Sequence, residues 1–203
     1  MTRVEFVLRT TAVMAVLLPV IIAASAAEQN MVGRPHEPDV DKTSATGTPC
    51  LFDPERGQVP NCIHEGKAGE LFVAPQYLKA LNFDAHGLAA VNSQKLGWAY
   101  VNRTGKAVIG GVPAMDNGAD GFHDGLVRIV RNGKFGFANR RGQFVVQPIY
   151  DGAMNFEKGR AAVCKGCENR CVDSGCEYHS FSGGEWFQIN TVGTVLTALH
   201  PHN

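Results

Sequence analysis

The sequence predicts an all-β protein built from tandem units, each a three-stranded antiparallel meander, that form an open solenoid or a partly closed barrel-like or propeller-like sheet. Three observations predict this class. The chain repeats one residue pattern three times, its β-branched and aromatic runs are short and end at turns containing Gly or Asn, and only residues 76–81 hint at helical periodicity. With 44% hydrophobic and 19% charged residues, the chain of 203 residues can bury a core.

The first segment, residues 1–27, has the pattern of an export signal peptide. Arg3 and Arg9 precede an apolar stretch over 12–23, and Ala24-Ser25-Ala26-Ala27 offers a cleavage site. The apolar stretch is shorter than the roughly 20 residues that span a bilayer. We therefore expect an exported protein, periplasmic or secreted, with no transmembrane span after cleavage; an uncleaved anchor is the alternative.

The second segment, residues 28–70, shows neither helical nor strand periodicity and contains five prolines, so irregular chain is predicted. Cys50 and Cys62 bracket a polar stretch that a local disulfide would hold together. All six cysteines follow the predicted signal peptide. An even number of cysteines in an oxidising compartment predicts a disulfide framework.

The third segment, residues 71–197, contains the repeat. Residues 73–83 match residues 146–156 without a gap at six of eleven positions, and a middle copy at 113–122 keeps the Pro, Ala and Phe. The predicted unit boundaries are about 71–110, 111–146 and 147–197, and residues 198–203 form a tail.

Within each unit the same three strands are expected. A Gly precedes a short apolar run, an aromatic strand follows, and an Asn-x-x-Gly turn leads to a closing strand. The predicted apolar runs are 88–91, 126–129 and 160–163, the aromatic strands are 98–102, 135–139 and 186–190, and the closing strands are 106–109, 143–146 and 194–196.

Aromatic side chains recur at matching positions of the units. We expect them to form the core between units, because a repeat cannot bury its own apolar face alone. An exposed recognition stripe is the alternative. These aromatic residues are Tyr77, Phe83, Trp98, Tyr100, Phe122, Phe135, Phe137, Tyr150, Phe156 and Trp186.

The last unit carries a cysteine-rich insertion, residues 164–184, predicted to be the tip of a hairpin. It contains Cys164, Cys167, Cys171 and Cys176, followed by His179. Two disulfides are the favoured interpretation. The alternatives are a zinc site made by these four cysteines, or by three of them with His179, and a redox pair at the C-x-x-C of Cys164 and Cys167.

Other candidate chemistry is sparse. Asp120, His123 and Asp124 lie together near a predicted turn, where an acid/base cluster competes with ordinary solvated surface. His200 and His202 lie on the tail, where metal binding competes with disorder. The sequence has no serine elbow, phosphate loop, HExxH or paired-carboxylate pattern, so neither an enzyme nor a cofactor is predicted. Its 19 basic and 19 acidic residues give no reason to expect a nucleic-acid partner.

The repeat resembles the WG-repeat (KWG-repeat) proteins of bacteria over residues 71–197. Trp98 and Trp186 match the family Trp, which Phe135 replaces. Gly136 matches the family Gly, whereas Ala99 and Phe187 differ from it. The resemblance implies all-β repeats, often exported, without a shared catalytic residue set.

Together these observations give two functional hypotheses. The leading one is an exported, non-catalytic β-repeat protein that binds another protein or an envelope component. The alternative is a metal-binding or thiol-redox protein centred on the cysteines from Cys164 to Cys176.

Overall fold

The computed structural model describes residues 47–53, 55, 57–115, 118–175 and 179–199, all of which belong to one compact unit of the chain. The predicted signal peptide, Cys176, His200 and His202 lie outside the described residues. The described strands are β1 Thr48–Leu51, β2 Val59–Glu65, β3 Leu71–Val73, β4 Leu88–Ser93, β5 Gly97–Asn102, β6 Ala107–Val112, β7 Ala114–Met115, β8 Gly118–Ala119, β9 Leu126–Arg131, β10 Lys134–Asn139, β11 Phe144–Tyr150, β12 Gly152–Ala153, β13 Arg160–Lys165, β14 Glu168–Cys171, β15 His179–Ser182, β16 Glu185–Asn190 and β17 Val195–Leu199.

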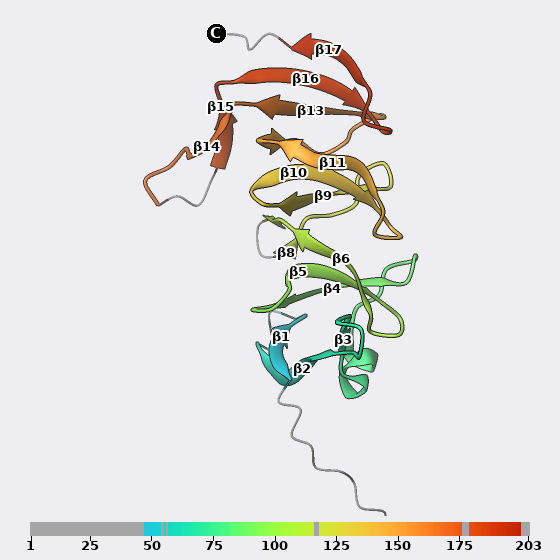
Figure 1. Ribbon diagram of the computed structural model, residues 1–203. Coiled ribbons are helices and arrows are strands. Elements are labelled where there is room, and N and C mark those ends of the chain that lie inside the picture. The colour runs from blue at the N-terminus through green and yellow to red at the C-terminus, as the bar shows by residue number, and fades with distance from the viewer. Residues whose placement is uncertain (1–46, 54, 56, 116–117, 176–178, 200–203) are drawn as a thin grey trace, which may run out of the picture. The chain divides into compact units, whose positions relative to one another are not determined.

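The all-β prediction is confirmed, because every sheet is antiparallel and the one helix among the described residues is a 3-10 helix, η1, at Pro75–Ala80 (Figure 1). The apolar run, aromatic strand and closing strand of each predicted unit pair in that order. They are β4-β5-β6, β9-β10-β11 and β13-β16-β17.

One turn recurs between the aromatic and closing strands. In the second unit, Asn139 Oδ1 accepts hydrogen bonds from the backbone N–H of Arg141 and of Gln143, at 2.9 and 3.1 Å. Asn102 and Asn190 accept the same two bonds in the first and third units. The asparagine side chain thus satisfies backbone donors inside the turn, which explains the Asn-x-x-Gly spacing.

The prediction of irregular chain over 28–70 is wrong for β1 and β2. These strands form because β1 is hydrogen-bonded on both sides, to β2 and to β4, and a short strand needs no alternation of its own when neighbours satisfy its backbone. The turn that follows β2 repeats the pattern of the later units. The N–H of Gly66 donates to Glu70 O at 2.7 Å, and the N–H of Gly69 donates to Gly66 O at 3.0 Å.

Strands β1 to β6 form one six-stranded sheet in the order β3-β2-β1-β4-β5-β6. A bridge between Phe72 and Lys106 and a 2.9 Å hydrogen bond from Val73 N to Gly105 O join its two edges, so the sheet is a nearly closed barrel. The predicted disulfide between Cys50 and Cys62 lies inside this barrel, and both residues are almost completely buried. The barrel alternative of the fold prediction is therefore present in this part of the chain.

The later sheets are separate from the barrel and pack against their neighbours through side chains. The ring of Tyr100 packs at a tilt against Phe122, and the ring of Phe137 packs edge-on against Phe156, with ring centroids 4.9 and 4.6 Å apart. Each pair joins the aromatic strand of one unit to the Phe of the next. Buried apolar side chains from consecutive units share a core around each pair.

The outward face of the third unit is polar where the corresponding face of the second unit is apolar. The second unit contributes three buried residues to the core that it shares with the third: Leu126, Phe137 and Val146. The positions that match them in strand pairing and turn spacing are polar in the third unit: Arg160, Gln188 and Thr197. Arg160 Nη1 donates to Gln188 Oε1 at 3.1 Å, so the two polar residues interact across the sheet.

We expect the triple variant Arg160→Leu, Gln188→Phe, Thr197→Val to self-associate, because it places apolar side chains on a sheet face that none of the described units covers. Sedimentation velocity at two protein concentrations measures this. A matched variant places three apolar residues at exposed sites near η1, Gln76→Leu, Lys79→Leu and Asn82→Leu, and should sediment as wild type. A triple variant that sediments as wild type at both concentrations would contradict the expectation.

Candidate interaction site at the inserted hairpin

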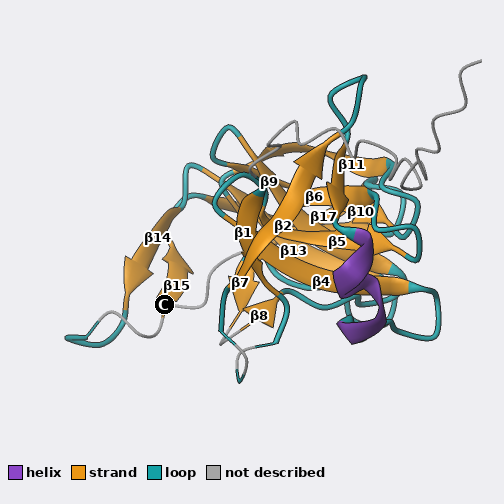
Figure 2. Cartoon of the chain, turned by 90° about the horizontal axis from the view of Figure 1, so that it is seen from below, coloured by secondary structure: helices purple, strands orange, loops and turns teal. Residues whose placement is uncertain are grey.

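The insertion of the third unit forms a hairpin of its own. In the second unit, β9 and β10 are joined directly by Asn132-Gly133, with Arg131 paired to Lys134. In the third unit, Lys165 and Glu185 form the corresponding last pair of β13 and β16, so residues 166–184 occupy the place of a two-residue turn. Within them β14 and β15 pair as a two-stranded ribbon that projects from the sheets (Figures 1 and 2).

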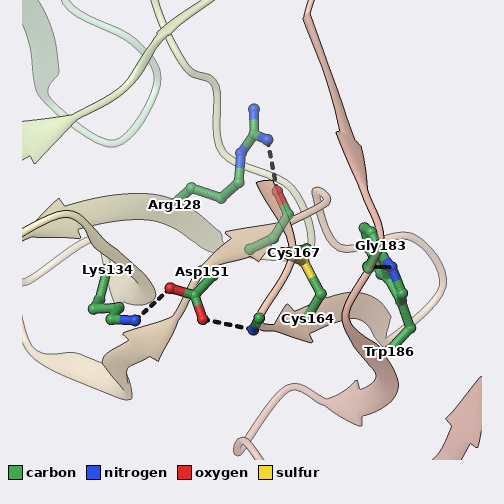
Figure 3. Close-up of a disulfide and its surroundings, with 9 residues drawn as sticks. Arg128, Lys134, Asp151, Cys164, Cys167, Gly183 and Trp186 are labelled. Atoms are coloured by element: carbon green, nitrogen blue, oxygen red, sulfur yellow. Dashed lines mark hydrogen bonds and ion pairs between the residues drawn. A yellow bond between two sulfur atoms is a disulfide. The ribbon is translucent and has the colours of Figure 1, made fainter. Parts of the chain in front are cut away.

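A disulfide between Cys164 and Cys167 closes the base of the hairpin (Figure 3). Cys164 belongs to β13, where it is fully buried and pairs with Trp186, and Cys167 directly precedes β14 with 7% of its surface exposed. Cys171, on β14, is also disulfide-bonded. The bond therefore ties the first strand of the hairpin to the body of the third unit.

The zinc alternative finds no support among the described residues. Because Cys164, Cys167 and Cys171 are all in disulfides, none of them has a thiolate to offer a metal. His179 pairs with Cys171 across the ribbon. No group of three or more His, Cys, Asp or Glu suited to a metal ion occurs in the part of the chain that the structure describes.

Asp151 also holds the hairpin base, next to the disulfide, by joining Gly166 to Lys134 of the second unit. One carboxylate oxygen accepts a 2.8 Å hydrogen bond from Gly166 N, and the other forms an ion pair with Lys134 (Figure 3). The Lys134 ammonium, and then the Gly166 N–H, hold the pKa of Asp151 below its ordinary value of 3.8. The ion pair requires the ionised carboxylate, and the hydrogen bond from Gly166 is stronger to it than to the protonated group.

Because the pKa of Asp151 is lower in the folded state, its stabilising effect is present above pH 3.8, the ordinary value, and is lost as the pH falls through the folded pKa. We expect Asp151→Asn to lower the urea midpoint at pH 6 and the difference from wild type to shrink towards pH 3. Urea unfolding at both pH values measures it. A difference that is constant with pH would contradict the assignment of the ionised carboxylate.

Two aromatic contacts complete the base. Phe181, on β15, packs edge-on against Phe135 of the second unit, with ring centroids 5.4 Å apart. Trp186 Nε1 donates to Gly183 O at 3.0 Å. The rings of Phe135 and Trp186, which occupy corresponding positions in their units, are therefore engaged by the insertion.

Beyond this base the ribbon is open to solvent. All four residues of β14 are exposed, and Glu168 and Arg170 pair with each other at 2.7 Å. Val172, which follows β14, keeps 61% of its surface exposed. The hairpin thus combines an ordered base with an exposed ribbon, which leaves the ribbon accessible to another molecule.

The remaining aromatic candidates divide between core and partly covered positions. Tyr77 donates its hydroxyl to Pro60 O at 2.8 Å, and Arg103 lies 5.3 Å from the centre of the Phe83 ring. Tyr150 is 4% exposed, and Trp98 packs partly buried on the core between the first two units.

The three polar candidates of the middle unit do not form one site. Asp120 is 2% exposed, so the solvated-surface interpretation is wrong for it. Its carboxylate accepts two hydrogen bonds from Arg128, at 2.8 and 3.1 Å. Asp124 instead accepts from Gly159 N at 2.6 Å, and His123 is exposed.

Sequence reasoning missed Arg128. The signal that could have found it is its place in the apolar run, where the other two units carry Ala90 and Ala162. A charge at a buried repeat position requires a buried partner, and Asp120 stands where the other units carry Leu81 and Met154.

A comparison with protein families matches residues 135–166 to the family described as WG containing repeat. These residues form a WG repeat. The matched segment begins at Phe135 in β10 and ends at Gly166, at the hairpin base. Searches of curated proteins and of solved structures found no match.

The structure explains the glycine of the WG pair in this unit. Gly136 is buried, and a Cβ atom there would lie 2.5 Å from Val146 O on the neighbouring strand. In this unit the two backbones thus lie too close together for a side chain at position 136. Among the described residues, no helix has the length and apolar content to cross a membrane.

Proposed function

We propose that this protein is an exported, non-catalytic binding protein that recognises another protein or an envelope component through the β14–β15 hairpin. The observation that carries the proposal is the contrast within the insertion. Its base is held by a disulfide, an ion-paired carboxylate and an aromatic contact, whereas all of β14 and the first two residues of β15 are exposed. Ordering a ribbon before binding lowers the entropy cost of recognition.

Three further points support the proposal. A two-stranded ribbon is marginal by itself in water, so covalent restraint has a physical purpose here. The disulfides fit an oxidising compartment outside the cytosol. The predicted signal peptide agrees with that location, and export predicts a mature chain that begins at Glu28, which N-terminal sequencing of the secreted or periplasmic fraction tests.

The chain itself supplies the variant that tests recognition. Replacing residues 166–184 by Asn-Gly, with Cys164→Val, gives the third unit the turn and the strand residue that the second unit has at Asn132-Gly133 and Val130. This hairpinless variant should keep the β-sheet circular dichroism and lose the partner. In a second variant, a photo-crosslinking residue replaces Val172, which is exposed just after β14. The matched control places the same photo-crosslinking residue at Gln76, on η1.

In intact cells, we expect a crosslinked species to form through position 172 and not through position 76. The partner in that species should no longer copurify with the hairpinless variant. Mass spectrometry identifies the partner. If the hairpinless variant folds and still copurifies the same partner, the hairpin is not the recognition element.

A further inference from the structure

We propose that the Cys164–Cys167 disulfide is an exchangeable bond, opened by a dithiol reductant, that controls how the β14–β15 hairpin is held on the third unit. The proposal rests on the proposed function, because it concerns the same hairpin. It assigns a redox modification site, with an effect on the hairpin, to the C-x-x-C pair for which the sequence left a redox role open.

The first argument is the size of the loop that the bond closes. Cys164 and Cys167 are three residues apart, whereas Cys50 and Cys62 are twelve apart. In the chain-entropy description, the stabilisation from a disulfide grows with loop length, so the shorter loop contributes less to global stability. The effect of Cys164–Cys167 is therefore mainly local: it sets the direction in which the chain leaves β13.

The second argument is the hinge that the bond spans. Gly166 and Gly184 have φ angles of 70° and 69° and lie at the two ends of the insertion. A Cβ atom on Gly184 would lie 2.4 Å from Lys165 O and 2.4 Å from Cys167 N, so the two chain segments cross in contact. The hairpin thus joins the sheet through two glycine-containing links, and the disulfide spans one of them.

The third argument is what remains when the bond opens. The described contacts at the base are then the Asp151 hydrogen bond to Gly166, the Trp186 hydrogen bond to Gly183, and the Phe181 ring on Phe135. These contacts are non-covalent. The two hydrogen bonds lie at or next to the glycines that link the hairpin to the sheet, and the third contact is made by a single ring, that of Phe181. Opening the disulfide therefore leaves the hairpin held by these weaker contacts alone, so that it moves more freely while the sheets stay folded.

The chemistry is ordinary thiol–disulfide exchange. A thiolate of the reductant attacks Sγ of Cys167, which is more exposed than Cys164. The S–S bond breaks, and Cys164 leaves as a thiolate and takes up a proton. The second thiolate of the reductant then attacks the reductant sulfur in the mixed disulfide. Cys167 leaves as a thiolate and is protonated, and the reductant departs as a disulfide, so two electrons reach the protein.

Cys50 and Cys62 provide an internal control. They are 1% and 0% exposed and lie in the core of the barrel, so exchange there requires the barrel to open. Under graded dithiothreitol without denaturant, followed by alkylation and peptide mapping, Cys164 and Cys167 should be alkylated while Cys50 and Cys62 stay bonded. The mapping assigns Cys171 and Cys176 separately. Alkylation of Cys164 and Cys167 only together with Cys50 and Cys62 would overturn the proposal.

Hydrogen exchange tests the effect on the hairpin. Relative to the oxidised protein, the reduced protein and the variant Cys164→Ala/Cys167→Ala should exchange the amides of residues 166–184 about 10-fold faster or more, with residues 126–150 unchanged. Unchanged exchange in residues 166–184 of the reduced protein would overturn the proposal. Neither measurement uses the partner, so a hairpinless variant that retains the partner defeats the proposed function alone.

Discussion

Asp120→Ala should lower the free energy of unfolding by about 3–5 kcal/mol, because it leaves the Arg128 guanidinium buried without its counter-ion. Arg128 is 6% exposed, and besides Asp120 it donates to Ala153 O of the third unit at 2.9 Å. Asn155 Nδ2 also donates to the Asp120 carboxylate, at 3.2 Å. The pair therefore joins the second unit to the third at their interface.

A double-mutant cycle separates the charge from the packing. Arg128→Leu should cost a similar amount, since it strands the buried carboxylate. The double variant Asp120→Ala/Arg128→Leu should recover most of the loss, because apolar replacements of a buried ion pair are often neutral or stabilising. Urea unfolding measures all three. Single variants that each cost less than about 1 kcal/mol would show that water or rearrangement compensates the remaining charge.

Gly142→Ala is expected to cost about 2–5 kcal/mol. Gly142 has a φ of 77°, in the left-handed region, where a side chain costs about 1–2 kcal/mol. In addition, a Cβ atom there would lie 2.0 Å from Val108 O, in the closing strand of the first unit. Backbone cannot rotate away as a flexible side chain does, so overpacking adds about 1–3 kcal/mol.

Gly133→Ala is the matched control. Gly133 has a φ of 73°, but a Cβ atom there meets nothing within 4 Å. The substitution should therefore lower the free energy of unfolding only by the cost of a side chain in the left-handed region, about 1–2 kcal/mol. Both variants are measured by urea unfolding under the same conditions. Equal losses would mean that the first and second units separate readily enough to admit the alanine.

The strands of the three predicted units were predictable because their determinants are local. Asn139 accepts hydrogen bonds from residues two and four positions ahead, so its turn can be recognised within one short window. Strands β1 and β2 were missed for the opposite reason. The pairing of β1 to β4 joins segments about 40 residues apart in the chain, and nothing in residues 48–65 alone reveals that neighbour.

The candidate site was predictable in the same partial way. The excess length and the cysteines marked the insertion, but the contacts that hold it come from elsewhere in the chain. Asp151 lies 15 residues before Gly166, and Phe135 belongs to the preceding unit. Charge and ring size are visible in a sequence, whereas the residue that they meet depends on how the units stack.

By itself, the sequence determined the all-β class, the recurring Asn-x-x-Gly turns and the position of the cysteine-rich insertion. Each of these depends on backbone geometry or on residue spacing within one unit, which short-range physics controls. Only the tertiary structure decided that β1 to β6 close into a barrel, that Asp120 meets Arg128 inside the protein, and that Cys164 bonds to Cys167 at the hairpin base. Barrel closure and the buried ion pair depend on which surfaces of different units pack together, and the cysteine pairing depends on which of several thiols the folded hairpin brings within bonding distance.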